Sequence, residues 1–128
     1  MRNSQNGDPL YAEAVLCCAE AVPVGRATSY GAIAEALAEV LGRGGPRQVA
    51  RVMSTQGSGV PWWRVVRADG TLPVELERRA AEQYSAEGTV RRPSGAVRFP
   101  VAWWQPDEAV LSELRGLAKA HEQGPSTA

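Results

Sequence analysis

The chain is 128 residues long, and 44% of its residues are hydrophobic while 22% are charged, a composition typical of one small soluble domain. Its 14 basic and 14 acidic residues cancel, which argues against an overall polycation. No apolar run is long enough to span a bilayer and residues 1–8 lack signal-peptide character, so the sequence predicts a cytoplasmic protein without a membrane partner. Cys17 and Cys18 are adjacent and lack metal-ligand spacing, so we expect no disulfide framework, no bound metal and no cofactor.

Two helices are predicted before residue 42. The first runs from Pro9 to Ala21 with Asp8 as its N-cap, because proline lacks a backbone N–H and fits the first helical position. The second follows a cap at Thr28 or Ser29 and continues to about Leu41, with apolar residues at four-residue spacing on one face.

A short third helix is predicted from Pro46 to about Ser54, after a break at residues 42–45. Its apolar residues can face inward, while Arg47 and Arg51, four positions apart, share the outer face. Two helices joined by a glycine-containing turn, the second of which carries arginines, predict a helix-turn-helix.

The second half of the chain is predicted to alternate extended segments with two further helices. The expected order is a loop at 56–59, a strand at 65–66, a helix at 76–86, an extended stretch at 89–101 and a last helix opened by Pro106. We therefore expect one domain over residues 9–105 and a C-terminal helix over 106–123. The ends, 1–8 and 124–128, are expected to be flexible.

Positive charge is concentrated in one segment. No acidic residue lies between Glu39 and Asp69, and five arginines fall there: Arg43, Arg47, Arg51, Arg64 and Arg67. A local basic field on a neutral protein suits binding to a phosphate backbone. The alternative is a chance gap in the acidic residues.

The pair Trp62-Trp63 stands between Pro61 and Arg64. If this segment is extended, neighbouring side chains point to opposite faces, so at least one indole is expected to line a surface cleft. An indole beside a guanidinium suits a flat ligand with polar edges, such as a nucleobase. The alternative is that each ring packs in one of two small cores.

Three ordered segments resemble the DNA-binding domain of O6-alkylguanine-DNA alkyltransferases. Residues 22–31 (VPVGRATSYG) resemble its opening and residues 45–53 (GPRQVARVM) its recognition helix. Residues 61–66 (PWWRVV) resemble the active-site motif Pro-Cys-His-Arg-Val-Val with both chemical residues replaced. A tryptophan in place of that cysteine marks the alkyltransferase-like proteins, non-enzymatic relatives that bind alkylated guanine in DNA and pass the lesion to nucleotide excision repair. The match is clear over residues 10–88.

The resemblance implies an α/β fold that is mostly α, with a winged helix-turn-helix-like core and short strands. It assigns four residues to DNA binding and base flipping. Tyr30 matches the tyrosine that presses on the target phosphate, and Arg47 matches the arginine finger that fills the vacated place in the stack. Ala50 is a small residue suited to close approach in the minor groove. Arg51 stands where the family usually has a second small residue, so it alters this approach or adds a phosphate contact.

The resemblance also assigns a lesion pocket made of Trp62, Trp63, Arg64 and Val65. Trp62 occupies the position of the nucleophilic cysteine, and Arg64 matches the arginine beside the pocket. Trp63 replaces a histidine that the alkyltransferase-like proteins usually retain. An indole is neither a thiolate nor a proton acceptor, so this motif cannot transfer an alkyl group.

The sequence thus predicts a non-enzymatic monomer whose partner is double-stranded DNA containing O6-alkylguanine, with nucleotide excision repair proteins as further partners by resemblance. In a bacterium it is expected to associate with the nucleoid. Cys17 and Cys18 are expected to be buried structural residues and His121 a surface residue. Two alternatives remain: a diverged alkyltransferase that uses another cysteine, and a sequence-specific helix-turn-helix regulator of undamaged DNA.

Overall fold

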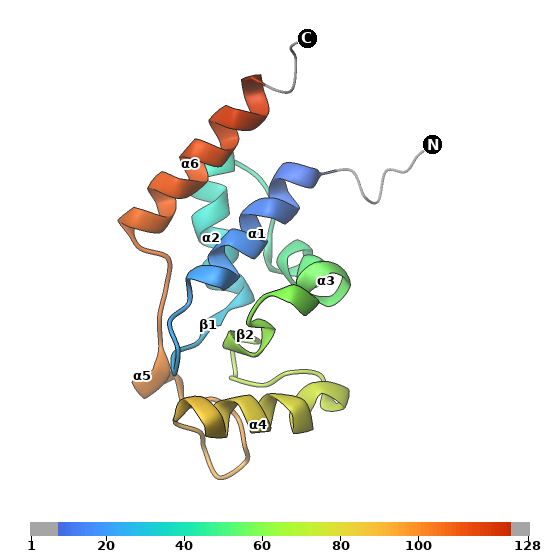
Figure 1. Ribbon diagram of the computed structural model, residues 1–128, viewed down its shortest axis with the longest axis vertical. Coiled ribbons are helices and arrows are strands. Elements are labelled where there is room, and N and C mark those ends of the chain that lie inside the picture. The colour runs from blue at the N-terminus through green and yellow to red at the C-terminus, as the bar shows by residue number, and fades with distance from the viewer. Residues whose placement is uncertain (1–7, 124–128) are drawn as a thin grey trace.

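The computed structural model describes residues 8–123, so the predicted flexible ends lie outside the described residues, apart from Asp8. Helices dominate this part of the chain, and two short strands lie near its centre (Figure 1). The elements are α1 (Pro9–Ala21), β1 (Thr28–Ser29), α2 (Tyr30–Leu41), α3 (Pro46–Gln56), β2 (Val65–Val66), α4 (Glu77–Glu87), α5 (Phe99–Ala102) and α6 (Glu108–Gln123). Across residues 8–123, no helix combines the length and the apolar character that a membrane crossing requires.

The predicted helix starts are confirmed by their caps. The Asp8 carboxylate accepts a hydrogen bond from the backbone N–H of Tyr11 at 3.1 Å, and Ser29 Oγ accepts one from the N–H of Ala32 at 3.0 Å. Pro46 is the first residue of α3, as its missing N–H predicts. Two starts differ from the prediction. Helix α4 begins at Glu77, one residue later than predicted. Helix α6 begins at Glu108, because Asp107 caps it and Pro106 precedes the cap.

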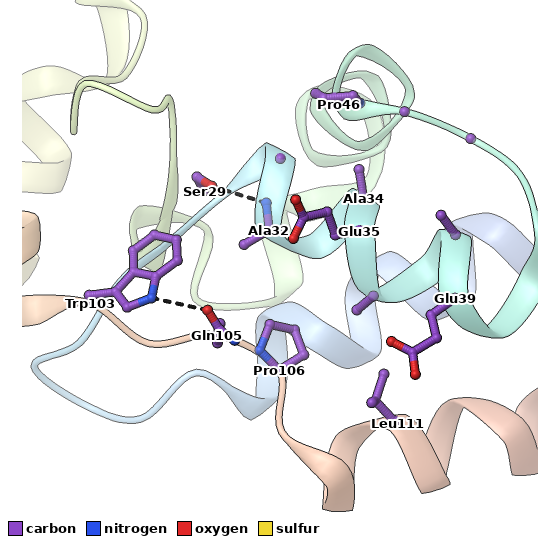
Figure 2. Close-up of a pocket in the computed structure, with 15 residues that line it drawn as sticks. Ser29, Ala32, Ala34, Glu35, Glu39, Pro46, Trp103, Gln105, Pro106 and Leu111 are labelled. Atoms are coloured by element: carbon purple, nitrogen blue, oxygen red, sulfur yellow. Dashed lines mark hydrogen bonds between the residues drawn. The ribbon is translucent and has the colours of Figure 1, made fainter.

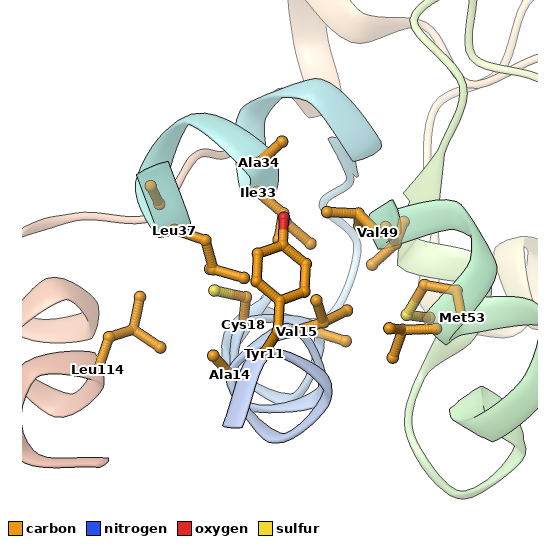
Figure 3. Close-up of a cluster of buried hydrophobic side chains, with 14 of the residues drawn as sticks. Tyr11, Ala14, Val15, Cys18, Ile33, Ala34, Leu37, Val49, Met53 and Leu114 are labelled. Carbon is orange, nitrogen blue, oxygen red and sulfur yellow. The ribbon is translucent and has the colours of Figure 1, made fainter. Parts of the chain in front are cut away.

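Helices α1, α2, α3 and α6 enclose the larger of two hydrophobic clusters (Figure 3). Tyr11, Ile33, Leu37 and Leu114 are fully buried at its centre, and the inward residues of α3 are buried as predicted. The smaller cluster packs α4 and the segment 96–102 against Val66. The helix-turn-helix consists of α2 followed by α3. The first helix, α1, and the last helix, α6, pack against it.

A glycine at the turn between α2 and α3 is required by the packing of Tyr11. Gly44 has φ +92°, and a Cβ at this position would overlap the Tyr11 ring. We expect Gly44→Ala to lower the free energy of unfolding by about 2–6 kcal/mol, since the strained φ and the forced repacking each cost about 1–3 kcal/mol. Gly42→Ala is the matched control, because Gly42 also has a positive φ, +75°, with no atom within 4 Å of its Cβ direction. Urea denaturation of both variants checks this, and equal losses would contradict it.

The two strands form a parallel pair that brings the tryptophan motif to the start of α2. Thr28 pairs with Val65 and Ser29 with Val66. Tyr30 follows one end of this short pair, Trp62 precedes the other end, and both line the same pocket. The strand at Val65–Val66 was predicted. Its partner at Thr28–Ser29 was predicted only as a helix cap, and the two residues both pair with β2 and lead into α2.

Two local predictions are wrong. The stretch 89–101 is not extended throughout, because Phe99–Ala102 forms the short helix α5 with a proline in its first turn. Residues Trp62–Arg64 form a 3-10 turn and not an extended segment, so strand alternation does not set the directions of the two indoles. Their rings instead meet edge-on, with centroids 5.5 Å apart and planes at 87°.

Candidate nucleic-acid interface

A pocket of about 330 Å³ opens beside Trp62, between the start of α2, the end of α3 and the segment that leads into α4. Tyr30, Trp62 and Val65 line it together. The remaining wall is contributed by Met53, Ser54, Gly57, Ser58, Leu72, Pro73, Glu75, Leu76 and Arg79. We call this cavity the Trp62 pocket.

The Trp62 ring carries a cation on one side. The guanidinium carbon of Arg79 lies 5.3 Å from the centroid of the indole, a distance at which a cation is attracted to the ring. The Arg79 side chain lines the pocket and faces the indole. The pocket therefore combines a flat apolar surface with a positive group at its edge.

Tyr30 adds a polar side chain to the lining of the pocket. Burial raises the pKa of its hydroxyl, and nearby Arg67 lowers it to a smaller extent. The group is therefore a neutral phenol near pH 7 and can donate a hydrogen bond to a phosphate oxygen or a base.

Trp63 and Arg64 do not line the Trp62 pocket, although they follow Trp62 directly. Both donate hydrogen bonds to the carboxylate of Glu87: Trp63 Nε1 at 2.9 Å, Arg64 Nη2 at 2.5 Å and Arg64 Nε at 3.1 Å. Arg64 Nη1 also donates to the carbonyl oxygen of Val22 at 2.9 Å. Both side chains therefore stabilise the turn that carries Trp62 and do not line the cavity.

Glu87 connects three parts of the fold. Besides Trp63 and Arg64, its carboxylate accepts a hydrogen bond from the N–H of Gly25 at 3.1 Å. Burial raises the pKa of Glu87, but the hydrogen bonds from Arg64, Gly25 and Trp63 lower it by more, so the net pKa lies below its ordinary value. In addition, the Tyr84 hydroxyl donates to the carbonyl oxygen of Trp63 at 2.6 Å. Helix α4 thus stabilises the 3-10 turn through Tyr84 and Glu87. Arg79, on the same helix, faces Trp62.

The arginines of α3 lie on a different surface. Arg47 and Arg51 are exposed and line a groove of about 920 Å³ between α3 and α1, together with Gln48 and Thr55. Ala50 is half-buried on the same helix and lines neither this groove nor the Trp62 pocket. The outer face predicted for Arg47 and Arg51 is therefore observed, and it adjoins the pocket because α3 contributes Met53 and Ser54 to the pocket wall.

The two cysteines are on the other side of the core. Cys18 is fully buried, and its burial raises the pKa of the thiol to about 12. Burial also raises the pKa of Cys17, and the carboxylates of Glu113 and Glu13 raise it further. Neither thiol is activated as a thiolate near pH 7, and neither lines the Trp62 pocket. His121 lies on the surface, 3.3 Å from a carboxylate oxygen of Glu13.

Comparison with known proteins identifies the family. Residues 11–88 match the sequence model of the 6-O-methylguanine DNA methyltransferase, DNA binding domain. The chain belongs to this family. A solved structure, Schizosaccharomyces pombe Atl1 in complex with damaged DNA containing O6-carboxymethylguanine, is similar to this chain with 26% identity and a TM-score of 0.57. The similarity covers 83% of this chain and 100% of that chain. No curated protein sequence matches.

The residues matched by the family model include the lining of the Trp62 pocket and Glu87. Sequence reasoning missed Arg79 and Glu87, although each is a charged residue of a predicted helix. Arg79 lies 17 positions from Trp62 in the chain, and Glu87 lies at least 23 positions from Trp63 and Arg64. Helical periodicity relates residues three or four positions apart, so it predicts neither contact.

Proposed function

We propose that this chain binds O6-alkylguanine in double-stranded DNA, with the damaged nucleotide turned out of the helix into the Trp62 pocket and its alkyl group left in place. The observation that carries this proposal is the position of Trp62, which places an indole in the pocket where a methyltransferase of this family needs a thiolate. The binding of Atl1 to damaged DNA supports the same function for this chain. It acts as a single copy, and the complex is recognised by nucleotide excision repair.

The energy balance of such binding is favourable. Turning a base out of duplex DNA costs a few kcal/mol, and less when alkylation has already weakened its pairing. Contact between an aromatic ring and a base contributes about 1–3 kcal/mol, which Trp62 is placed to supply. Arg79 adds a cation beside the same ring, and the apolar wall at Met53 and Leu72 accommodates an alkyl group.

Helix α3 is proposed to bind the minor groove beside the pocket. In this proposal Arg47 fills the place left by the extruded base, Tyr30 presses on its phosphate, and Ala50 leaves room for close approach. Arg51 is exposed on the same face as Arg47 and is proposed to contact a phosphate. The proposed lesion pocket also includes Trp63, Arg64 and Val65. Val65 lines the cavity, while Trp63 and Arg64 are proposed to hold the turn that carries Trp62.

Titration of fluorescent duplexes tests this function. The duplex with O6-methylguanine is expected to bind more tightly than the same duplex with guanine. We expect Arg47→Ala and Tyr30→Ala each to weaken binding of the lesion duplex by about 10-fold, because each removes a contact that forms only when the nucleotide is extruded. Arg115→Ala is the control, since Arg115 is an exposed arginine of α6 in contact with Glu108. Equal affinity for the two duplexes, or unchanged lesion binding in both variants, would refute the proposal.

A further inference from the structure

A second groove, of about 580 Å³, lies between α2 and the segment 103–111 (Figure 2). Small residues of α2, including Ala32 and Ala34, form its floor, and the turn that leads into Pro46 closes one end. Trp103 and Pro106 form the facing wall. We call it the α2 groove. The segment 103–111 lies beyond the residues matched by the family model, so one wall of this groove is outside the family domain.

The α2 groove has a charge opposite to that of the proposed DNA-binding surface. Glu35 and Glu39 line it, are exposed and lie one helical turn apart, and no arginine or lysine lines it. Among the ion pairs of residues 8–123, neither carboxylate has a basic partner. Such a groove repels phosphate and is complementary to a basic segment.

Trp103 is fixed as an aromatic wall of the groove. Its carbonyl oxygen accepts a hydrogen bond from the Arg26 guanidinium, and its indole N–H donates to Gln105 Oε1 at 3.3 Å. Phe99 packs edge-on against it, with ring centroids 5.0 Å apart. The ring is only half-buried, and Figure 2 shows it across from Ser29 and Ala32. A fixed, half-exposed indole beside carboxylates is a suitable stacking surface for a guanidinium.

An unused polar group lies beneath the same groove. The Tyr11 hydroxyl is fully buried and has no hydrogen-bond partner within the described residues. It lies against Gly44, which lines the groove, and Figure 3 shows the Tyr11 ring pointing to α2.

We infer that the α2 groove is the docking site for an extended basic segment of a partner protein. Alternate side chains of an extended chain point the same way about 6.6 Å apart, which matches the spacing of residues one turn apart on a helix. Two such side chains can therefore reach Glu35 and Glu39 while a third, an arginine, stacks on Trp103. The groove adjoins the proposed DNA interface, since Ser29 and Pro46 line it and are followed in the chain by Tyr30 and Arg47. The inference goes beyond the proposed function and does not require it, because the groove is formed in the free chain.

Titration of the ¹⁵N-labelled chain with a synthetic peptide tests this inference. The probe is acetyl-Arg-Ala-Arg-Ala-Arg-Ala-Arg-amide at about 0.15 M salt, where weak surface attraction is screened. Saturable amide shifts are expected in residues 31–39 and 103–111 and at the Trp103 indole N–H. The matching peptide with glutamate in place of arginine is expected to give none.

Charge-reversed variants separate specific docking from general attraction to acidic residues. The double variant Glu35→Lys and Glu39→Lys is expected to weaken peptide binding at least 10-fold. The control is Glu13→Lys with Glu20→Lys, which reverses two exposed charges on α1 and is expected to leave binding unchanged. Dispersed amide spectra of both variants, and their retained affinity for the lesion duplex, check the fold and the proposed function independently.

Three results would overturn the inference. The first is no saturable binding of the arginine peptide, and the second is equal binding by the two charge-reversed variants. The third is a shift of the same groove resonances on addition of undamaged DNA, which would assign the groove to nucleic acid.

Discussion

Trp62→Ala is expected to weaken binding of an O6-methylguanine duplex by about 5- to 150-fold, since contact between an aromatic ring and a base is worth ~1–3 kcal/mol. Binding of the undamaged duplex is expected to change by less than about threefold, because phosphate contacts supply most of the affinity for undamaged DNA and Trp62 makes none of them. Fluorescence titration of the two duplexes against wild type and variant measures both values.

The matched control is Trp103→Ala. Trp103 is also a half-buried tryptophan, but it lies in the α2 groove and not in the Trp62 pocket. Its removal is expected to leave the affinity for both duplexes unchanged. If the Trp62 variant lost affinity for damaged and undamaged DNA equally, the indole would be part of a general DNA contact and not of a lesion pocket.

Glu87→Ala is expected to lower the free energy of unfolding by about 3–5 kcal/mol, the usual loss when one partner of a buried ion pair is removed. The Arg64 side chain is only 13% exposed and the Glu87 side chain 10%, so the remaining guanidinium would stay buried without its carboxylate. The same substitution removes the hydrogen-bond acceptor of Trp63 Nε1 and of the Gly25 N–H. Chemical denaturation monitored by circular dichroism measures the loss.

Two controls show whether the loss comes from the uncompensated charge. The double variant Glu87→Gln with Arg64→Met removes both charges and is expected to be more stable than Glu87→Ala. Glu108→Ala breaks an exposed ion pair with Arg115 and is expected to have little effect, since such pairs contribute little. A Glu108 variant as unstable as the Glu87 variant would contradict this explanation.

The stability of the protein is expected to depend on pH through the same carboxylate. The pKa of Glu87 in the folded chain lies below its ordinary value of 4.5. Its stabilising contribution is therefore complete above pH 4.5 and is lost as the pH falls through the lower folded pKa. Asp8, whose pKa is lowered chiefly by its hydrogen bonds with Arg43, contributes in the same direction. Thermal unfolding between pH 3 and pH 6 should show a smaller acid loss in Glu87→Gln than in wild type.

Local sequence features predicted much of the fold. Asp8, Ser29 and Pro46 mark helix starts because capping and the missing N–H of proline act within a few residues. The helix-turn-helix followed from these starts and from the break at residues 42–45. The short helix α5 was missed because its four residues are too few to show a helical period.

The site was predicted only in part, because its support depends on distant contacts. Tyr30, Trp62 and Val65 meet because β1 pairs with β2, which no local pattern specifies. The expectation that Trp63 lies at the pocket surface differs from its observed position, where its indole N–H is directed to Glu87. The motif at residues 61–66 contains two residues of the Trp62 pocket, Trp62 and Val65, and the tertiary structure determines that Trp62 and not Trp63 lines it.

Native mass spectrometry of a competition mixture tests the central claim most directly. The protein is mixed with equal amounts of two duplexes that differ only in the presence of O6-methylguanine or guanine, each in excess over protein. We expect the methylated duplex to occupy most of the protein, with the methyl group still on the DNA and the mass of the protein unchanged. Equal occupancy of the two duplexes, or protein heavier by one methylene unit, would contradict the account.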